Sequence, residues 1–162
     1  MIHIPDLYCA PHKYQSAVAG IEYTESAGDP WIATDTYTLK TYKWKNEQEA
    51  WAGITKLIKA GHHLAVGIAQ IKVSNFKRYH VRLSTALDPC GAARAVANAL
   101  RLNYLWAEGR GYTGIGILEA AASGYTSGHL RPRDAQTTAY VQRVVYIAQE
   151  VSYQEHPTKS NS

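Results

Sequence analysis

The stretch 20-GIEYTESAGDP-30 joins the end of a predicted helix to the turn that follows it. We expect this helix to begin at Pro11, because proline is favoured at the first helical position, and to run to about Ser26. Gly28 and Pro30 then end it. The stretch contains three carboxylates, so the first question is which of them does chemistry.

The position of each carboxylate follows from the apolar stripe of the helix. Apolar residues recur at helical spacing at Tyr14, Ala17, Val18 and Ile21. Four residues after Ile21 comes Glu25, which should therefore point with the buried face. Glu22 should lie at the edge of the stripe, nearer solvent, and Asp29 should help to form the turn.

The remaining segments predict a mostly α-helical, α+β architecture. Residues 31–44, rich in Thr, Tyr and Trp, favour a short β-hairpin or an ordered extended loop. Four further helices are expected: one opened by the cap Asn46 and ended by Gly61, one opened by Asp88-Pro89 and ended near Gly109, a short one over 117–123, and one over 133–152.

Length and composition predict a single globular domain over residues 1–155, followed by a disordered tail at 156–162. The net charge of +4 favours an anionic partner, but no basic recognition helix supports nucleic-acid binding. No apolar run is long enough to cross a membrane, and the first residues lack the pattern of a signal peptide.

Two patterns that could hold a metal or a phosphate are weak. The pair His62-His63 has no Cys, Asp or Glu nearby at ligand spacing, which disfavours a zinc site. The glycines of 109-GRGYTGIG-116 are not followed by Lys-Ser/Thr, so a flexible connection is the better interpretation. We therefore expect neither a metal nor an organic cofactor.

An acid on the apolar face at the C-terminal end of a helix should have a raised pKa. Burial disfavours its charged form, and the negative end of the helix dipole repels it. An acid that stays protonated near neutral pH can protonate the leaving oxygen of a glycosidic bond. The alternative is that Glu25 only hydrogen-bonds a backbone group in the core.

Five motifs, in order, resemble the lysozyme-like lytic transglycosylases of glycoside hydrolase family 23, and in particular the specialised members attached to type IV secretion and conjugation systems. GIEYTESAGDP resembles the Glu-Ser motif of that family. The others are 67-GIAQIKVSNF-76, 87-LDPC-90, 120-AAASGYTSG-128 and 140-YVQRV-144, so the resemblance extends from Cys9 to about Val151.

The resemblance implies a role for each matching residue. Glu25 falls on the catalytic acid/base, and Tyr125 on the tyrosine whose hydroxyl lies beside that Glu and orients it. Gly67 should let a sugar approach the backbone, and Gln70 should hydrogen-bond the glycan. The implied substrate-binding set is Ser26, Gly67, Ile68, Gln70, Asn75, Thr126 and Tyr140, in which Asn75 and Tyr140 act as supporting residues.

Two positions depart from the family pattern. Lys72 stands where the family has Asn after Gln-Ile, and Thr126 where it has Asn after Tyr, and either change could alter how the sugar is held. Many glycosidases use two carboxylates. The resemblance instead implies that one Glu acts as acid and then as base, with a 1,6-anhydro product. Asp29 is the rival partner for a second carboxylate.

The resemblance also implies a location and partners. Cys9 and Cys90, which alone would read as two buried thiols, should form a disulfide, and a disulfide agrees with a periplasmic enzyme whose export signal lies outside these 162 residues. The implied partners are peptidoglycan glycan strands and secretion-system components. A hydrolytic muramidase and a non-catalytic peptidoglycan-binding assembly factor remain as alternatives.

Overall fold

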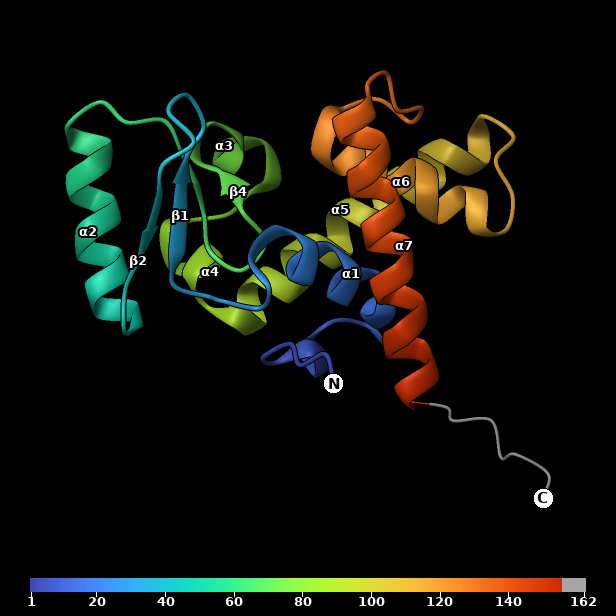
Figure 1. Ribbon diagram of the computed structural model, residues 1–162, viewed down its shortest axis with the longest axis horizontal. Coiled ribbons are helices and arrows are strands. Elements are labelled where there is room, and N and C mark those ends of the chain that lie inside the picture. The colour runs from blue at the N-terminus through green and yellow to red at the C-terminus, as the bar shows by residue number, and fades with distance from the viewer. Residues whose placement is uncertain (156–162) are drawn as a thin grey trace.

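The computed structural model describes residues 1–155 and places a small sheet beside a group of longer helices (Figure 1). The helices are α1 (Gln15–Ser26), α2 (Glu47–Lys59), α3 (Phe76–Tyr79), α4 (Leu83–Leu87), α5 (Pro89–Gly109), α6 (Ile115–Ser127) and α7 (Ala135–Glu155). Short 3-10 turns are η1 (Leu7–Cys9), η2 (His12–Tyr14) and η3 (Val73–Asn75). The mostly α-helical class expected from the sequence is confirmed.

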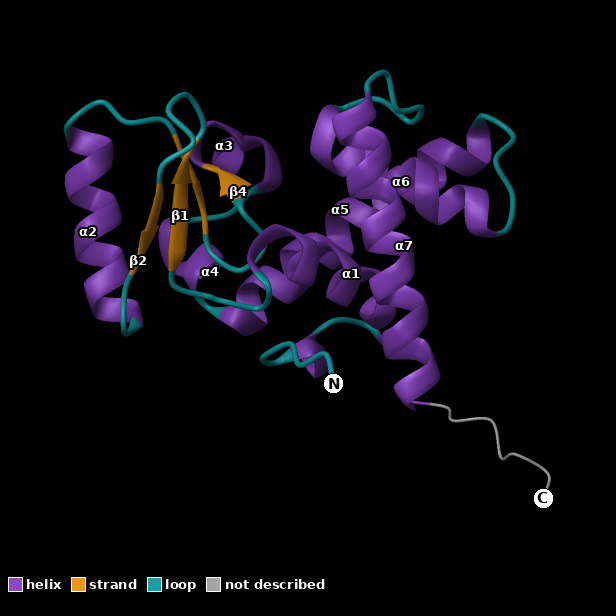
Figure 2. Ribbon diagram, in the orientation of Figure 1, coloured by secondary structure: helices purple, strands orange, loops and turns teal. Residues whose placement is uncertain are grey.

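The sheet is antiparallel, with the strand order β2-β1-β3-β4 (Figure 2). Its strands are β1 (Ile32–Asp35), β2 (Thr41–Lys43), β3 (Leu64–Val66) and β4 (Ile71–Lys72). Strands β1 and β2 form the hairpin predicted over 31–44, with Ala33 opposite Tyr42. The other two strands were not predicted. They bring the segment after β3 next to the end of α1.

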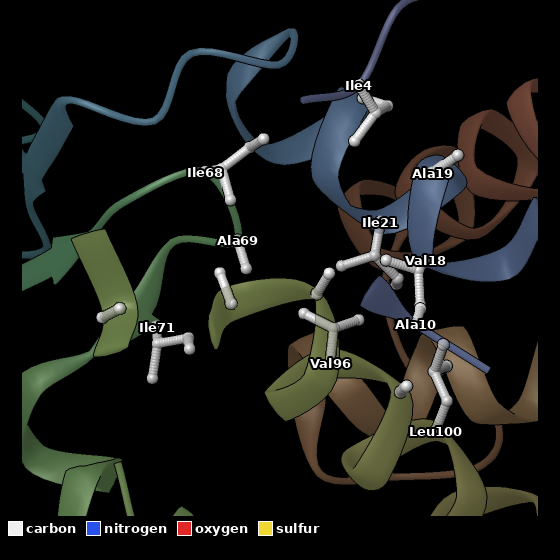
Figure 3. Packing of buried hydrophobic residues seen from close by; sticks show 14 of the residues in the cluster. Ile4, Ala10, Val18, Ala19, Ile21, Ile68, Ala69, Ile71, Val96 and Leu100 are labelled. Carbon is white, nitrogen blue, oxygen red and sulfur yellow. The ribbon is translucent and has the colours of Figure 1, made fainter. Parts of the chain in front are cut away.

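Helix α1 lies at the centre of the molecule, and its surroundings correct one expectation. All residues from Ala17 to Glu22 are buried, because α1 packs against both α5 and α7. Figure 3 shows Val18 and Ile21 of α1 close to Val96 and Leu100 of α5. The prediction that Glu22 lies at a solvent-facing edge is therefore wrong: its side chain is 0% exposed.

The predicted helix caps are confirmed, and the helix bounds shift by a few residues. Asn46 accepts a hydrogen bond from the Glu49 backbone N–H at 2.9 Å, and Asp88 accepts one from the Gly91 backbone N–H at 2.9 Å. Both bonds satisfy amides that the first turn of a helix leaves free. Helix α6 is longer than the predicted 117–123, and the helix expected from Pro11 begins with the turn η2.

The N-terminal segment is fixed to the helical part by a disulfide between Cys9 and Cys90, whose Cα atoms are 5.3 Å apart. This confirms the pairing implied by the family resemblance. Within residues 1–155, no helix is long and apolar enough to span a membrane. The tail predicted to be disordered, 156–162, lies outside the described residues.

Candidate active site

A groove of about 740 Å³ lies between the sheet and the helical part. Strands β1, β3 and β4 and helix α3 line one side, and helices α5 and α6 line the other. The lining is largely polar and includes three aromatic side chains. Its polar and aromatic members include Glu25, Gln70, Lys72, Asn75, Tyr79, Asn103, Trp106, Tyr125, Thr126 and Gln136.

The acid in this groove is Glu25, at the C-terminal end of α1. The hydroxyl of Tyr140, on α7, donates a hydrogen bond to Glu25 Oε1 at 2.8 Å. Burial raises the pKa of Glu25 to about 7, whereas the Tyr140 hydrogen bond and the positive charge of Lys72 act in the opposite direction. Near neutral pH both protonation states of Glu25 are therefore populated.

Glu25 is the only carboxylate among the described residues that line the groove. Glu22, one turn earlier on α1, is fully buried, and neither of its oxygens has a hydrogen-bond partner. Burial raises the pKa of Glu22 to about 8. Asp29 Oδ1 accepts the Trp31 backbone N–H at 2.9 Å, which is the turn-forming contact expected of it.

The segment from Gly67 to Gln70 connects β3 to β4, and its geometry changes two expectations. Gly67 has φ of 79°, and a Cβ there would collide with the carbonyl oxygen of Ala86. The structure thus explains the glycine by close packing against α4, and not by the approach of a sugar. The Ile68 side chain is 0% exposed, so it faces the core and not the groove.

The same segment is attached to the helix that carries the acid. Ser26 Oγ donates a hydrogen bond to the Ile68 carbonyl at 2.7 Å, so the serine next to Glu25 has a structural contact. Gln70 adopts a left-handed conformation with φ of 48°, donates from Nε2 to the Gly67 carbonyl at 3.0 Å and lines the groove. This connection fixes Gln70 relative to Glu25.

Two tyrosines lie near the acid, and the hydrogen bond comes from the one not expected to make it. The Tyr125 hydroxyl donates to the Ala69 carbonyl at 3.0 Å, whereas Tyr140 donates to Glu25. Burial and then the negative charges of Glu25 and Glu22 raise the pKa of Tyr125 well above its usual value, so Tyr125 still lies near both acids. The orienting contact implied for Tyr125 is made by Tyr140.

Several groove residues were not identified from the sequence. Asn103 and Trp106 lie three residues apart on α5 and therefore share one helix face. Tyr79 on α3 and Gln136 on α7 complete the set. The sequence signal that could have found the first pair is a tryptophan three residues after an asparagine, with both residues off the apolar stripe of the helix; Trp106 is 41% exposed in the structure.

His62 and His63 make separate contacts with neighbouring side chains. His62 Nδ1 lies 2.7 Å from Asp35 Oδ2, and the His63 ring is 4.3 Å from the Tyr37 ring, centroid to centroid. Over residues 1–155 there is no group of three or more His, Cys, Asp or Glu that could hold a metal ion.

The fold and the site together define a mostly α-helical protein with one protonatable acid in an open polar groove. The chain is 32% identical to protein VirB1 of Rhizobium radiobacter and to protein VirB1 of Agrobacterium tumefaciens strain 15955, over 143 residues that make up 88% of this chain. It is also 34% identical over 96 residues to protein VirB1 of Agrobacterium fabrum strain C58. These matches confirm the recognition made from the sequence motifs, at the level of a VirB1-like protein.

The matches cover only part of those relatives. The alignment covers 59% of the length of the proteins from Rhizobium radiobacter and Agrobacterium tumefaciens. It covers 39% of the length of the Agrobacterium fabrum protein, and 59% of this chain in that comparison. No protein-family model matches the sequence. No solved structure matches it either.

Proposed function

We propose that the chain is a peptidoglycan lytic transglycosylase, which cleaves the β-1,4 bond between N-acetylmuramic acid and N-acetylglucosamine and leaves a 1,6-anhydromuramic product. The observation that carries this proposal is Glu25, an acid with a pKa of about 7 in an open groove that offers no second carboxylate among the described residues. The VirB1 similarity supports the same class.

In the first step, Glu25 acts as a general acid. Its carboxyl proton moves to the glycosidic oxygen as the bond from that oxygen to C1 of the muramic ring breaks. The positive charge that develops on the ring is stabilised by the 2-acetamido group of the sugar. The raised pKa keeps a large fraction of Glu25 protonated at neutral pH, as this step requires.

In the second step, the Glu25 carboxylate acts as a general base. It takes the proton of the C6 hydroxyl as the C6 oxygen bonds to C1, which closes the anhydro ring and regenerates the protonated acid. Lys72 and the Tyr140 hydroxyl both favour the carboxylate form that this step needs. Tyr140 also holds the carboxyl in one orientation, through its 2.8 Å bond to Oε1.

Within residues 1–155, Glu25 is the only carboxylate that lines the groove, and this favours an internal nucleophile. Retaining and inverting glycosidases place a second carboxyl roughly 5 to 9.5 Å from the first, to act as nucleophile or to activate water. Glu22 is buried without any hydrogen-bond partner, and Asp29 is engaged by the Trp31 amide. The C6 hydroxyl of the substrate supplies the nucleophile that the groove does not.

The groove lining suits a glycan. Amide side chains such as Gln70 and Asn103 can bond sugar hydroxyls and N-acetyl groups, and the faces of Tyr79 and Trp106 can pack against sugar rings. Asn75 and Thr126 add further polar groups on opposite sides. In this proposal these residues bind substrate, and Ser26, Gly67 and Ile68 support the groove from behind.

The cellular context belongs to the same proposal. The motif resemblance to the transglycosylases of type IV secretion systems, together with the VirB1 matches, supports a protein that opens the cell wall locally for assembly of such a system. The Cys9–Cys90 disulfide supports a periplasmic location, because disulfides persist in oxidising compartments. Secretion-system components are then its protein partners.

Mass spectrometry of the products released from purified sacculi tests the reaction. Wild-type protein should release anhydro-terminated muropeptides, and Glu25→Gln should not. Glu119→Gln, which neutralises an exposed acid of α6 outside the groove, is the matched control and should keep full activity. Reducing-end muramic acid would instead identify a muramidase, and no release by folded wild-type protein would favour a binding protein.

A further inference from the structure

A second cavity, of about 600 Å³, adjoins the glycan groove at its helical side. It is formed by the end of α5, the turn that joins α5 to α6, and the segment that joins α6 to α7. These connections can be followed in Figure 1. Trp106 and Gly128 line both cavities, so the second opens beside the first.

The described residues that line this cavity carry positive charges and no negative ones. Its described lining includes Arg110, Arg131 and Arg133 together with His129, and no carboxylate. The three arginines are exposed, and within residues 1–155 none of them forms an ion pair. The nearest acid in sequence, Asp134, accepts the Thr137 backbone N–H at 2.7 Å. We call this cavity the arginine pocket.

Guanidinium groups without an internal partner are suited to carboxylates, which they bind with two parallel N–H donors. The arginine pocket also has an apolar surface, formed by Tyr112, Leu130 and Trp106, against which an aliphatic chain can pack. Its volume lies in the range of sites that hold small organic ligands. The expected ligand is therefore a short chain with free carboxylates.

We infer that the arginine pocket binds the carboxylates of the peptide stem that branches from muramic acid. The inference rests on the proposed function, because it takes the glycan strand to lie in the neighbouring groove. A branch that leaves the strand beside Trp106 and Gly128 enters the arginine pocket directly. The pocket thus selects peptide-bearing regions of the wall over peptide-free strands.

The test compares two substrates: intact glycan strands with their peptide stems, and the same strands after an amidase has removed the stems. The variant is the double substitution Arg131→Gln/Arg133→Gln. The control is Arg94→Gln/Arg101→Gln, which removes the same charge from exposed positions of α5 outside both cavities. Thermal unfolding of both variants checks that they are folded.

For the pocket variant we expect KM on peptide-bearing strands to rise by roughly tenfold, the size expected for losing charged hydrogen bonds. KM on peptide-free strands should be unchanged, and the control variant should match wild type on both. An equal change on both substrates, or none on either, would overturn the inference.

Failure of the proposed function is recognised separately. In that case neither substrate is converted by wild-type protein, yet co-sedimentation of Glu25→Gln protein with the two kinds of strand still measures binding. Preferential binding of peptide-bearing strands, reduced by Arg131→Gln/Arg133→Gln in the same background, would sustain the pocket assignment without catalysis. Equal binding of both strands would end it.

Discussion

Two acids one turn apart on α1 have different surroundings. Glu25 is partly exposed in the groove and bonded to Tyr140, whereas Glu22 is enclosed and unbonded. Both have raised pKa values, about 7 and about 8, with burial as the main cause. Only Glu25 can reach a substrate, so a raised pKa alone does not identify the catalytic acid.

Activity should decline as the pH rises through about 7, because the first step needs protonated Glu25. Lys72 lowers the pKa of Glu25, so Lys72→Gln should move this alkaline limb to higher pH. Lys72→Arg, which keeps the charge, should leave the limb in place. Lys77→Gln on α3, outside the groove, is the control. A pH profile of kcat/KM that Lys72→Gln leaves unmoved would contradict this prediction.

Glu22 should reduce stability at neutral pH. The pKa of Glu22 is about 8 in the folded protein, against the usual 4.5. The folded state is therefore most stable with respect to this group below about pH 4.5, where Glu22 is protonated in both states, and that stability is lost as the pH rises towards 8. Glu22→Met should therefore increase the free energy of unfolding at pH 7 by about 1 to 3 kcal/mol and flatten its pH dependence. Urea denaturation at several pH values measures both effects.

The exposed Glu119→Met is the control for that substitution, and it should change neither the stability nor its pH dependence. In the Glu22→Met protein, Glu25 should still make the free energy of unfolding fall as the pH rises from about 4.5 to 7, with a smaller slope. If Glu22→Met lowered the stability at pH 7, an unseen partner of the carboxylate would have to exist.

At the scale of single residues, the sequence identified Glu25, Gln70 and Asn75 in the groove but misplaced Glu22. Counting by four from Ile21 reaches Glu25, whereas counting by four from Val18 reaches Glu22. The choice between the two assumes one buried stripe. Helix α1 is covered on more than one side by its neighbours, so the single-stripe rule fails there.

Among the elements, the caps and long helices could be predicted, and the short pieces could not. Asn46 and Asp88 are local signals that act within one turn, so they can be read without tertiary information. Strands β3 and β4 are three and two residues long, too short for an alternating pattern. Strand β3 pairs with β1, which lies far away in the sequence, and β4 is then added to the sheet by pairing with β3.

Gly67→Ala should destabilise the connection between β3 and β4. The new Cβ would meet the Ala86 carbonyl, and φ of 79° is unfavourable for alanine. We expect the free energy of unfolding to fall by about 2 to 4 kcal/mol. Gly61→Ala has a similar φ of 90° with open space around the new Cβ, and should cost only about 1 kcal/mol. Equal losses would mean that the Ala86 contact is unimportant.

At the scale of the whole molecule, the disulfide closes a loop between residues 81 positions apart. Replacing both cysteines by serine should lower the free energy of unfolding by about 4 kcal/mol, by the loop-entropy estimate. Chemical denaturation under oxidising conditions measures this loss. A reducing agent should weaken wild-type protein to the same extent and leave the double variant unaffected; an effect on the variant would indicate another cause.

The hydrogen bond from Tyr140 to Glu25 joins residues 115 positions apart, from the first and last long helices of the described chain. A nascent chain therefore has its acid long before it has the group that orients it. Forming a contact of such high sequence separation requires the long intervening chain to be closed, which carries an entropic cost. Unfinished or unfolded copies would be harmless to the polymer that the finished protein is proposed to cut, so the topology itself delays activity until folding is complete.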